Sequence, residues 1–145
     1  MMRLLNLIAI LILIVAPSCH QTASNAKTTN KKLVIDGLEL NNGEKWKANP
    51  ETTEGINNMI SLVENMSEQP TVEDYHNLGL ALEKEKKYIL NQCTMNGVAH
   101  DNLHQYLMPL IRRINGVKEV ESIEKGNKIY SYIKNHLNAY SDYFE

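Results

Sequence analysis

Apolar side chains recur every three or four positions through most of residues 50–143, which is the repeat of an amphipathic helix. Interruptions of this pattern predict four helices, at 50–66, 72–94, 98–114 and 118–143. The last two interruptions contain Asn-Gly dipeptides, at 96–97 and 115–116, which favour turns. Because short connections make consecutive helices antiparallel neighbours, the sequence predicts an all-α domain folded as an up-down-up-down four-helix bundle.

Residue types at the expected helix starts agree with this division. Asn49 can cap the first helix, and Pro50 suits a first helical position. Thr71 and Asp74 have the spacing of a capping box at the start of the second helix. Gly55 weakens the first helix by about 1 kcal/mol relative to alanine. The first two helices therefore have clear starts but unequal intrinsic strength.

Only the stretch 33–46 (LVIDGLELNNGEKW) has the composition of a strand. Its Asn42-Gly43 pair is a strong signal for a two-residue hairpin turn. We therefore expect a short N-terminal β-hairpin, with 38–41 pairing against 44–47, ahead of the first helix. Trp46 is expected to cover one end of the core.

The chain begins with an apolar run at residues 4–16, broken only by Asn6 and preceded by Arg3. This run is shorter than the ~20 residues of a membrane span and fits the apolar region of a secretory signal peptide. It ends in Val-Ala-Pro-Ser before Cys19, which resembles a bacterial lipobox. That resemblance implies cleavage before Cys19 and lipidation of its thiol and amine. An ordinary signal peptide and an uncleaved anchor are the alternatives.

Three segments follow from this interpretation: a lipoprotein signal peptide at 1–18, a flexible tether at 19–32 and the helical bundle domain at 33–145. The segment 20–32 has no apolar side chain larger than alanine, so it has too little to bury to offset the entropy of ordering. Acyl chains on Cys19 would hold the domain beside a membrane at the cell envelope, on its periplasmic side or at the outer surface.

Composition narrows the classes of partner. With 17 acidic and 15 basic residues the net charge is −2, so no strong basic field exists and nucleic acid is a poor partner. Two cysteines cannot provide the disulfide framework of a small secreted fold. The hydrophobic share of 43% supplies a real core, which is mostly aliphatic because the chain has one Phe and one Trp.

Two histidines at the start of the third helix are the first candidate ligands. His100 and His104 are separated by four residues, which places both imidazoles on one helix face, about 6 Å apart along the axis. The same spacing serves helical zinc sites. The pair opens a heptad seam that continues through Leu107, Ile111 and Ile114. We therefore expect both histidines to point toward the core.

Cys93 and Met95 lie just before the turn that leads to this helix. Folding the chain at 96–97 brings Cys93 to about the height of His100, with Met95 at the edge of the turn. Thiolate and thioether suit Cu(I), and imidazole suits copper and zinc alike. The four side chains predict a site for copper, or else zinc. Alternatively the histidines are core residues bonded to a carbonyl or a tyrosine, Cys93 is a small core side chain and Met95 only packs.

Three other positions bear on function. His76 is expected at the opposite end of the bundle, and His136 is expected exposed beside the apolar stripe of the fourth helix. Pro109 has no N–H to bond the carbonyl of Gln105, which predicts a bent third helix.

The segment 138–143 (NAYSDY) resembles the last turn of the soluble periplasmic b-type cytochromes, which are four-helix bundles. In that family a histidine that binds haem follows Asn-Ala-Tyr, where this chain has Ser141, and the axial methionine position holds Thr53 or Glu54. Both haem-ligand positions therefore depart from the family. No Cys-x-x-Cys-His motif exists, so covalent haem is excluded.

The pattern Cys-Thr-Met-x-Gly-x-Ala-His-x-x-x-His, with the Asn-Asn-Gly turn and Trp46, also resembles small lipoproteins of Bacteroidetes-type bacteria. That likeness implies a lipid-anchored envelope protein with a helical domain.

Taken together, the residues favour a non-enzymatic lipoprotein that binds a soft transition metal, most of all copper, for sequestration or delivery. The alternative is an envelope interaction module without metal, which docks to an envelope protein partner. A haem-binding bundle using His100 or His104 is the third hypothesis. An enzyme is disfavoured because no Ser-His-Asp order, glycine-rich phosphate loop or paired inward carboxylates can be drawn. A Cys93–His100 nucleophile would need an exposed cleft.

Overall fold

The computed structural model describes residues 33–145. The expected signal peptide (1–18), Cys19 and the tether (19–32) lie outside the described residues. In chain order, the helices of these residues are α1 (Pro50–Glu64), α2 (Val72–Gln92), α3 (Gly97–Val117), α4 (Ile123–Asn138) and the short α5 (Tyr140–Tyr143). Within residues 33–145 no helix is both long and apolar enough to span a bilayer.

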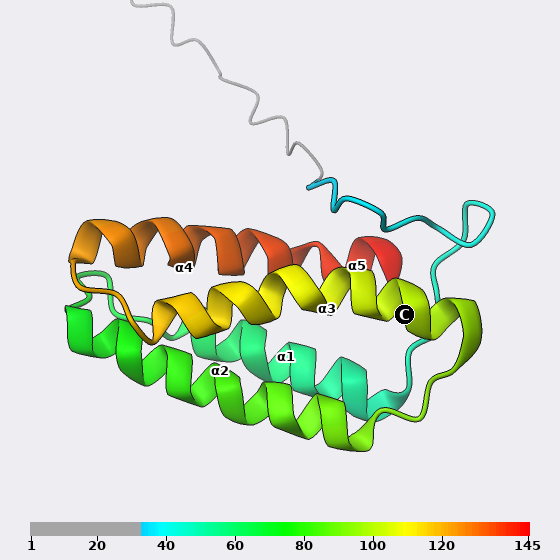
Figure 1. Ribbon diagram of the computed structural model, residues 1–145, viewed down its shortest axis with the longest axis horizontal. Coiled ribbons are helices and arrows are strands. Elements are labelled where there is room, and N and C mark those ends of the chain that lie inside the picture. The colour runs from blue at the N-terminus through cyan, green and yellow to red at the C-terminus, as the bar shows by residue number, and fades with distance from the viewer. Residues whose placement is uncertain (1–32) are drawn as a thin grey trace, which may run out of the picture. The chain divides into compact units, whose positions relative to one another are not determined.

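The four long helices run alternately in opposite directions along one bundle (Figure 1). Each packs against its two neighbours around a closed ring, α1 on α2, α2 on α3, α3 on α4 and α4 on α1. The prediction of an all-α fold built from four helices is confirmed.

The Asn115-Gly116 pair does not end the third helix, although the sequence predicts a break there. Helix α3 continues to Val117, which is completely buried, as is Ile114 one turn before it. Burial of these side chains outweighs the turn preference of an Asn-Gly pair. The following helix consequently starts later than expected, at Ile123, where the Ser122 hydroxyl accepts a hydrogen bond from the N–H of Lys125 at 3.3 Å.

The starts of α1 and α2 test the capping predictions. At α2 the capping box is confirmed, since the Thr71 hydroxyl accepts from the N–H of Asp74 and the Asp74 carboxylate accepts from the N–H of Thr71. At α1 the Asn49 side chain makes no bond to the helix backbone. Its Oδ1 accepts from the hydroxyl of Thr52 at 2.6 Å instead, so Asn49 closes the first turn through a side chain.

Glycines allow two of the closest helix crossings. A Cβ on Gly55 of α1 would lie 2.4 Å from the Ile89 side chain of α2. A Cβ on Gly126 of α4 would lie 2.3 Å from the ring of Tyr75, also on α2. The low helix propensity of Gly55 is therefore offset by close packing, because only a residue without a side chain lets the helices approach this far.

The segment before α1 folds back on the C-terminal end of the chain. The Asn42-Gly43 turn has positive φ at both residues and is closed by two backbone hydrogen bonds between Asn41 and Glu44, of 2.9 and 3.0 Å. Residues 33–145 contain no strand longer than such isolated bridges, and the longer hairpin of 38–41 with 44–47 stays a prediction.

Trp46 joins this segment to the end of the bundle. The backbone N–H of Trp46 donates to the carbonyl of Tyr143 at 2.8 Å, and its backbone carbonyl accepts from the N–H of Glu145 at 3.0 Å. The indole packs against the core, and its N–H donates to the carbonyl of Glu39 at 2.6 Å. The N-terminal segment and the C-terminus thus close the bundle together.

Candidate functional site

His100 and His104 lie one turn apart near the start of α3, and their rings are in direct contact. The two Nε2 atoms are 3.1 Å apart, and the ring centroids are 4.5 Å apart at an interplanar angle of 75°. At this distance one Nε2–H donates to the lone pair of the other Nε2. The structure therefore brings two imidazole nitrogens within hydrogen-bonding distance of each other.

This spacing matches the separation that a chelated metal ion requires. Imidazole nitrogens bind zinc at about 2.0–2.1 Å, and two such bonds to atoms 3.1 Å apart enclose an angle of about 100° at the metal. That angle lies between the ideal square and tetrahedral values, so both nitrogens can bind one ion when each ring carries its proton on Nδ1 and turns its Nε2 lone pair toward the metal. The spacing of four residues on one helix supplies this separation of the two nitrogens.

The histidine pair does not face the core, and the prediction that it would is wrong. His104 is exposed and His100 is half-buried. The buried face of α3 consists of Leu103, Tyr106, Leu107, Leu110, Ile114 and Val117. His104 follows Leu103 by one residue, a rotation of about 100°, which carries its side chain off that face. The predicted seam has the spacing of the observed buried face, but it is rotated about the helix axis toward His104.

Cys93 and Met95 are not assembled with the histidines into a complete ligand set. Cys93 ends α2, donates its N–H to the carbonyl of Ile89 at 2.9 Å and packs half-buried against the core, as Met95 also does. Among residues 33–145 no three His, Cys, Asp or Glu side chains are grouped for a metal ion. The structure thus places a pair of adjacent imidazole nitrogens beside the connection from α2 to α3.

His136 is the histidine that sequence reasoning misplaced. The sequence predicts an exposed side chain, yet His136 is completely buried between α3 and α4. Its Nε2–H donates to the carbonyl of Tyr106 at 2.8 Å, and the Tyr106 hydroxyl donates to the carbonyl of His136 at 3.1 Å. His136 lies three residues after Ile133 and four before Tyr140, and both of these side chains are buried. This helical spacing is the sequence signal that could have placed His136 on the inward face.

The His136 imidazole carries one polar atom without a partner. Its Nδ1 is buried and makes no hydrogen bond within the described part of the chain. Burial lowers the pKa of His136, although the hydrogen bond to Tyr106 raises it. The ring also stacks on Tyr132 at 5.6 Å between centroids, and the guanidinium of Arg113 covers Tyr132 at 4.6 Å. A neutral imidazole therefore fits this position, whereas a protonated one lacks a partner.

His76 and Pro109 have structural roles in the described contacts. The Nε2–H of His76 donates to the carbonyl of Val120 at 2.8 Å, which ties the start of α2 to the link between α3 and α4. Pro109 lies inside α3, and the helix continues past it in both directions. It removes the N–H that would bond the carbonyl of Gln105.

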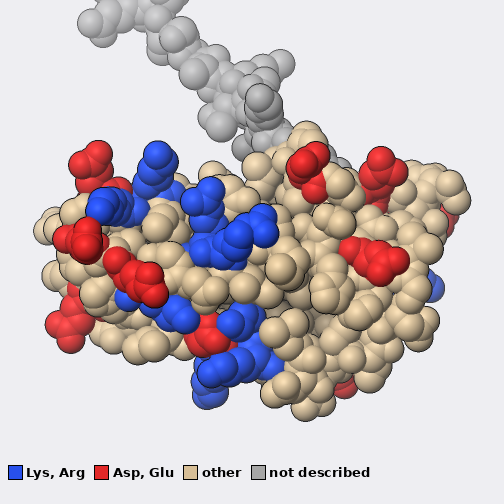
Figure 2. Space-filling model, viewed as in Figure 1, with Lys and Arg blue, Asp and Glu red and all other residues tan. Residues whose placement is uncertain are grey.

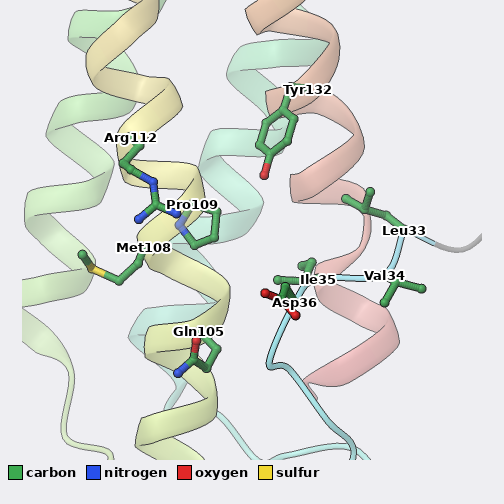
Figure 3. Close-up of a pocket in the computed structure, with 9 residues that line it drawn as sticks. All are labelled: Leu33, Val34, Ile35, Asp36, Gln105, Met108, Pro109, Arg112 and Tyr132. Carbon is green, nitrogen blue, oxygen red and sulfur yellow. The ribbon is translucent and has the colours of Figure 1, made fainter.

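A groove lies between α3, α4 and the segment that precedes α1 (Figure 3). Its volume is about 450 Å³. It is lined by Leu33, Val34, Ile35, Asp36, Gln105, Met108, Pro109, Arg112 and Tyr132. A smaller hollow of about 240 Å³ shares Pro109, Arg112 and Tyr132 with it and is also lined by Arg113. No sequence pattern indicates this groove, because residues 33–36 are far from α3 along the chain.

Thr53 and Ser141, the two positions where the sequence departs from the haem ligands of the b-type cytochromes, do not contact each other through a described hydrogen bond. The Thr53 hydroxyl lies 3.0 Å from the hydroxyl of Tyr140, and Ser141 is exposed. Tyr140 also packs its buried ring against Tyr106 and Phe144. The space between α1 and the last turn is therefore occupied by side chains.

Comparison of the chain with protein-family models, curated proteins and solved structures gives no match.

Proposed function

We propose that this chain is a lipoprotein of the cell envelope, anchored to a membrane by lipid on Cys19, whose helical domain binds copper through His100 and His104. The role is metal sequestration or delivery, and zinc is the second choice of metal. The observation that supports this proposal is the 3.1 Å separation of the two Nε2 atoms, which matches a chelate of one ion.

Exposure of the pair favours delivery over permanent storage. Two imidazoles fill only two coordination positions, and His104 is open to solvent. The remaining positions are then available to water or to a donor from another protein, which is how an ion can be handed on. Imidazole binds copper more tightly than zinc by the general order of divalent metals, which is why copper comes first.

Cys93 and Met95 are the proposed additional ligands for the reduced metal. Residues 93–96 lie outside α2 and α3, so this connection can adjust without breaking either helix. A thiolate or thioether from it would shift the preference of the site toward Cu(I). Under this proposal the histidine pair binds oxidised copper or zinc alone, and the sulfur ligands matter only for Cu(I).

The test is metal affinity of the full chain, purified in detergent under reducing conditions and without an affinity His tag. Competition against a Cu(I) chelator and a zinc indicator ranks the metals. The decisive variant exchanges two neighbours, His104→Gln with Gln105→His, because it keeps the composition and moves one imidazole about 100° around α3. Near-stoichiometric binding should weaken at least tenfold, or about 1.4 kcal/mol, in this variant and in His100→Ala.

Two results would contradict the proposal. One is the absence of binding in the unaltered chain, and the other is equal affinity in the exchanged variant. Far-ultraviolet circular dichroism and the melting temperature serve as controls, since both side chains are outside the core and the helices should remain intact. Cys93→Ser and Met95→Leu should lower Cu(I) affinity while leaving zinc affinity unchanged.

If metal binding fails, the envelope interaction module without metal becomes the better hypothesis. The observation that favours it is the set of large apolar side chains left exposed on α2 and at the start of α3. Leu80 is 62% exposed, Leu90 is 50% exposed and Val98 is 63% exposed. Such side chains are the usual anchors of a protein partner when they lie close together.

A further inference from the structure

The groove between α3, α4 and residues 33–36 has the size of a small-molecule site. Its volume of about 450 Å³ falls within the range of roughly 300–1,000 Å³ that such sites occupy. Apolar walls come from Leu33, Met108 and Pro109, and Met108 is 47% exposed. The groove shares no residue with the histidine pair, so binding in it would be independent of the proposed metal site.

Opposite charges face this groove from different elements. Arg112 projects from α3, and Asp36 comes from the segment before α1 (Figure 3). Among the ion pairs of residues 33–145, none includes either side chain. Neither side chain has a hydrogen bond to another described residue. Within residues 33–145 the groove therefore presents a cation and an anion that have no ion-pair partner, on a lining of mixed polar and apolar side chains.

Neutral polar groups accompany both charges. The hydroxyl of Tyr132 points toward the groove, and the side chain of Gln105 lies beside it (Figure 3). The carbonyl of Gln105 lacks its usual helical donor because Pro109 has no N–H. The guanidinium of Arg113 lies over the face of the Tyr132 ring, 4.6 Å from its centroid, and adds positive charge beside the groove. Figure 2 shows Lys and Arg side chains gathered over the middle of this face.

We propose that this groove binds a zwitterionic ligand, an apolar dipeptide with free ends. The ligand's carboxylate is held by the guanidinium of Arg112 and the hydroxyl of Tyr132. Its ammonium is held by the carboxylate of Asp36 and an oxygen of Gln105. A plain anion would be repelled by Asp36, and a plain cation by Arg112, so only a ligand that carries both charges satisfies both side chains.

The experiment titrates the full chain in detergent with the dipeptide Leu-Leu, by isothermal calorimetry. Two derivatives serve as probes of the charges: N-acetyl-Leu-Leu lacks the ammonium, and Leu-Leu-amide lacks the carboxylate. We expect saturable binding of Leu-Leu and at least tenfold weaker binding of each derivative. Arg112→Gln and Asp36→Asn should each weaken Leu-Leu binding at least tenfold.

Matched controls change the same charges outside the groove. Lys134→Gln removes an exposed positive charge from α4, and Glu39→Gln removes an exposed negative charge close to Asp36 in sequence. Both should leave Leu-Leu affinity unchanged. Unaltered melting temperatures in all four variants show that the fold is kept, as expected for exposed side chains.

Three outcomes would overturn the proposal. The first is no saturable binding of Leu-Leu. The second is equal binding of N-acetyl-Leu-Leu, which would make the groove an anion site in which Asp36 has no part. The third is unchanged affinity in Arg112→Gln, which would place the peptide elsewhere on the chain.

Discussion

Acid should destabilise this bundle through His136, which is buried as a neutral imidazole between α3 and α4. Burial lowers its pKa below the ordinary value near 6.5. Its Nε2–H donates to the carbonyl of Tyr106. If Nδ1 were also protonated, its N–H would have no acceptor in the described part of the chain. The groups that surround it are the rings of Tyr106 and Tyr132, with the cation of Arg113 beyond the latter. The hydrogen bond to the Tyr106 carbonyl favours the imidazolium, but the cost of burying its charge is larger.

The sign and size of the effect follow from proton linkage. Because the folded pKa is lowered, the unfolded chain takes up a proton first as the pH falls through about 6.5. The stability contributed by neutral His136 is complete above that pH and is lost below it. The loss continues until the pH reaches the folded pKa. The slope is at most about 1.4 kcal/mol per pH unit, the value for one proton.

The assay compares the unaltered chain with His136→Phe, by urea unfolding followed by circular dichroism at pH 7.5 and 5.5. Phenylalanine keeps an aromatic ring against Tyr106 and Tyr132 but does not titrate. At pH 7.5 the variant should be less stable by about 1–3 kcal/mol, since the Tyr106 carbonyl loses its donor. At pH 5.5 this difference should shrink by up to about 1.4 kcal/mol.

Carboxylates that titrate over this range are present in both proteins, so they cancel in the comparison. Glu83 does not titrate between these pH values, because hydrogen bonds from Lys86 and Lys118 lower the pKa of its carboxyl. A stability difference that stays constant between the two pH values would refute the assignment of His136 as a buried neutral base.

Three substitutions test the packing and capping contacts by their free energies of unfolding. Gly126→Ala should destabilise the fold by at least about 2 kcal/mol, because its Cβ would lie 2.3 Å from the ring of Tyr75. Gly116→Ala is its matched control: the nearest side-chain atom, on Ile129, would be 3.5 Å away, so α3 should gain about 0.5–1 kcal/mol from helix propensity. Thr71→Ala should cost about 1 kcal/mol by removing the capping box of α2. Equal stabilities of the two glycine variants would contradict the close contact between Gly126 and Tyr75.

The four helices could be predicted because their apolar repeat is strong and local signals agree with it. The Thr71–Asp74 capping box is an example of a short-range sequence signal whose predicted hydrogen bonds are present in the structure. The boundary near Asn115-Gly116 could not be predicted in the same way. Its outcome depends on Val117 being buried by the rest of the bundle, which no local pattern reveals.

The histidine pair was predictable only in part. Spacing of four residues fixes the contact between His100 and His104, because it depends on helix geometry alone. The direction of the pair depends on which apolar residues α3 buries. Leu107 and Ile114 belong to both the predicted seam and the observed buried face, but the observed face contains Leu103 and Leu110 in place of His104 and Ile111.

The same rotation of α3 explains why both candidate sites lie on one helix. Burying the face that contains Leu103 and Leu110 leaves His104 and Arg112 exposed. His104 meets a partner on its own helix, so its site is local and its spacing is visible in the sequence. Arg112 shares its groove with Asp36, whose segment is held by the buried side chain of Ile35 and by the Tyr143 hydroxyl, which donates to the carbonyl of Leu33 at 3.3 Å. A site assembled from segments this far apart becomes apparent only once the fold is known.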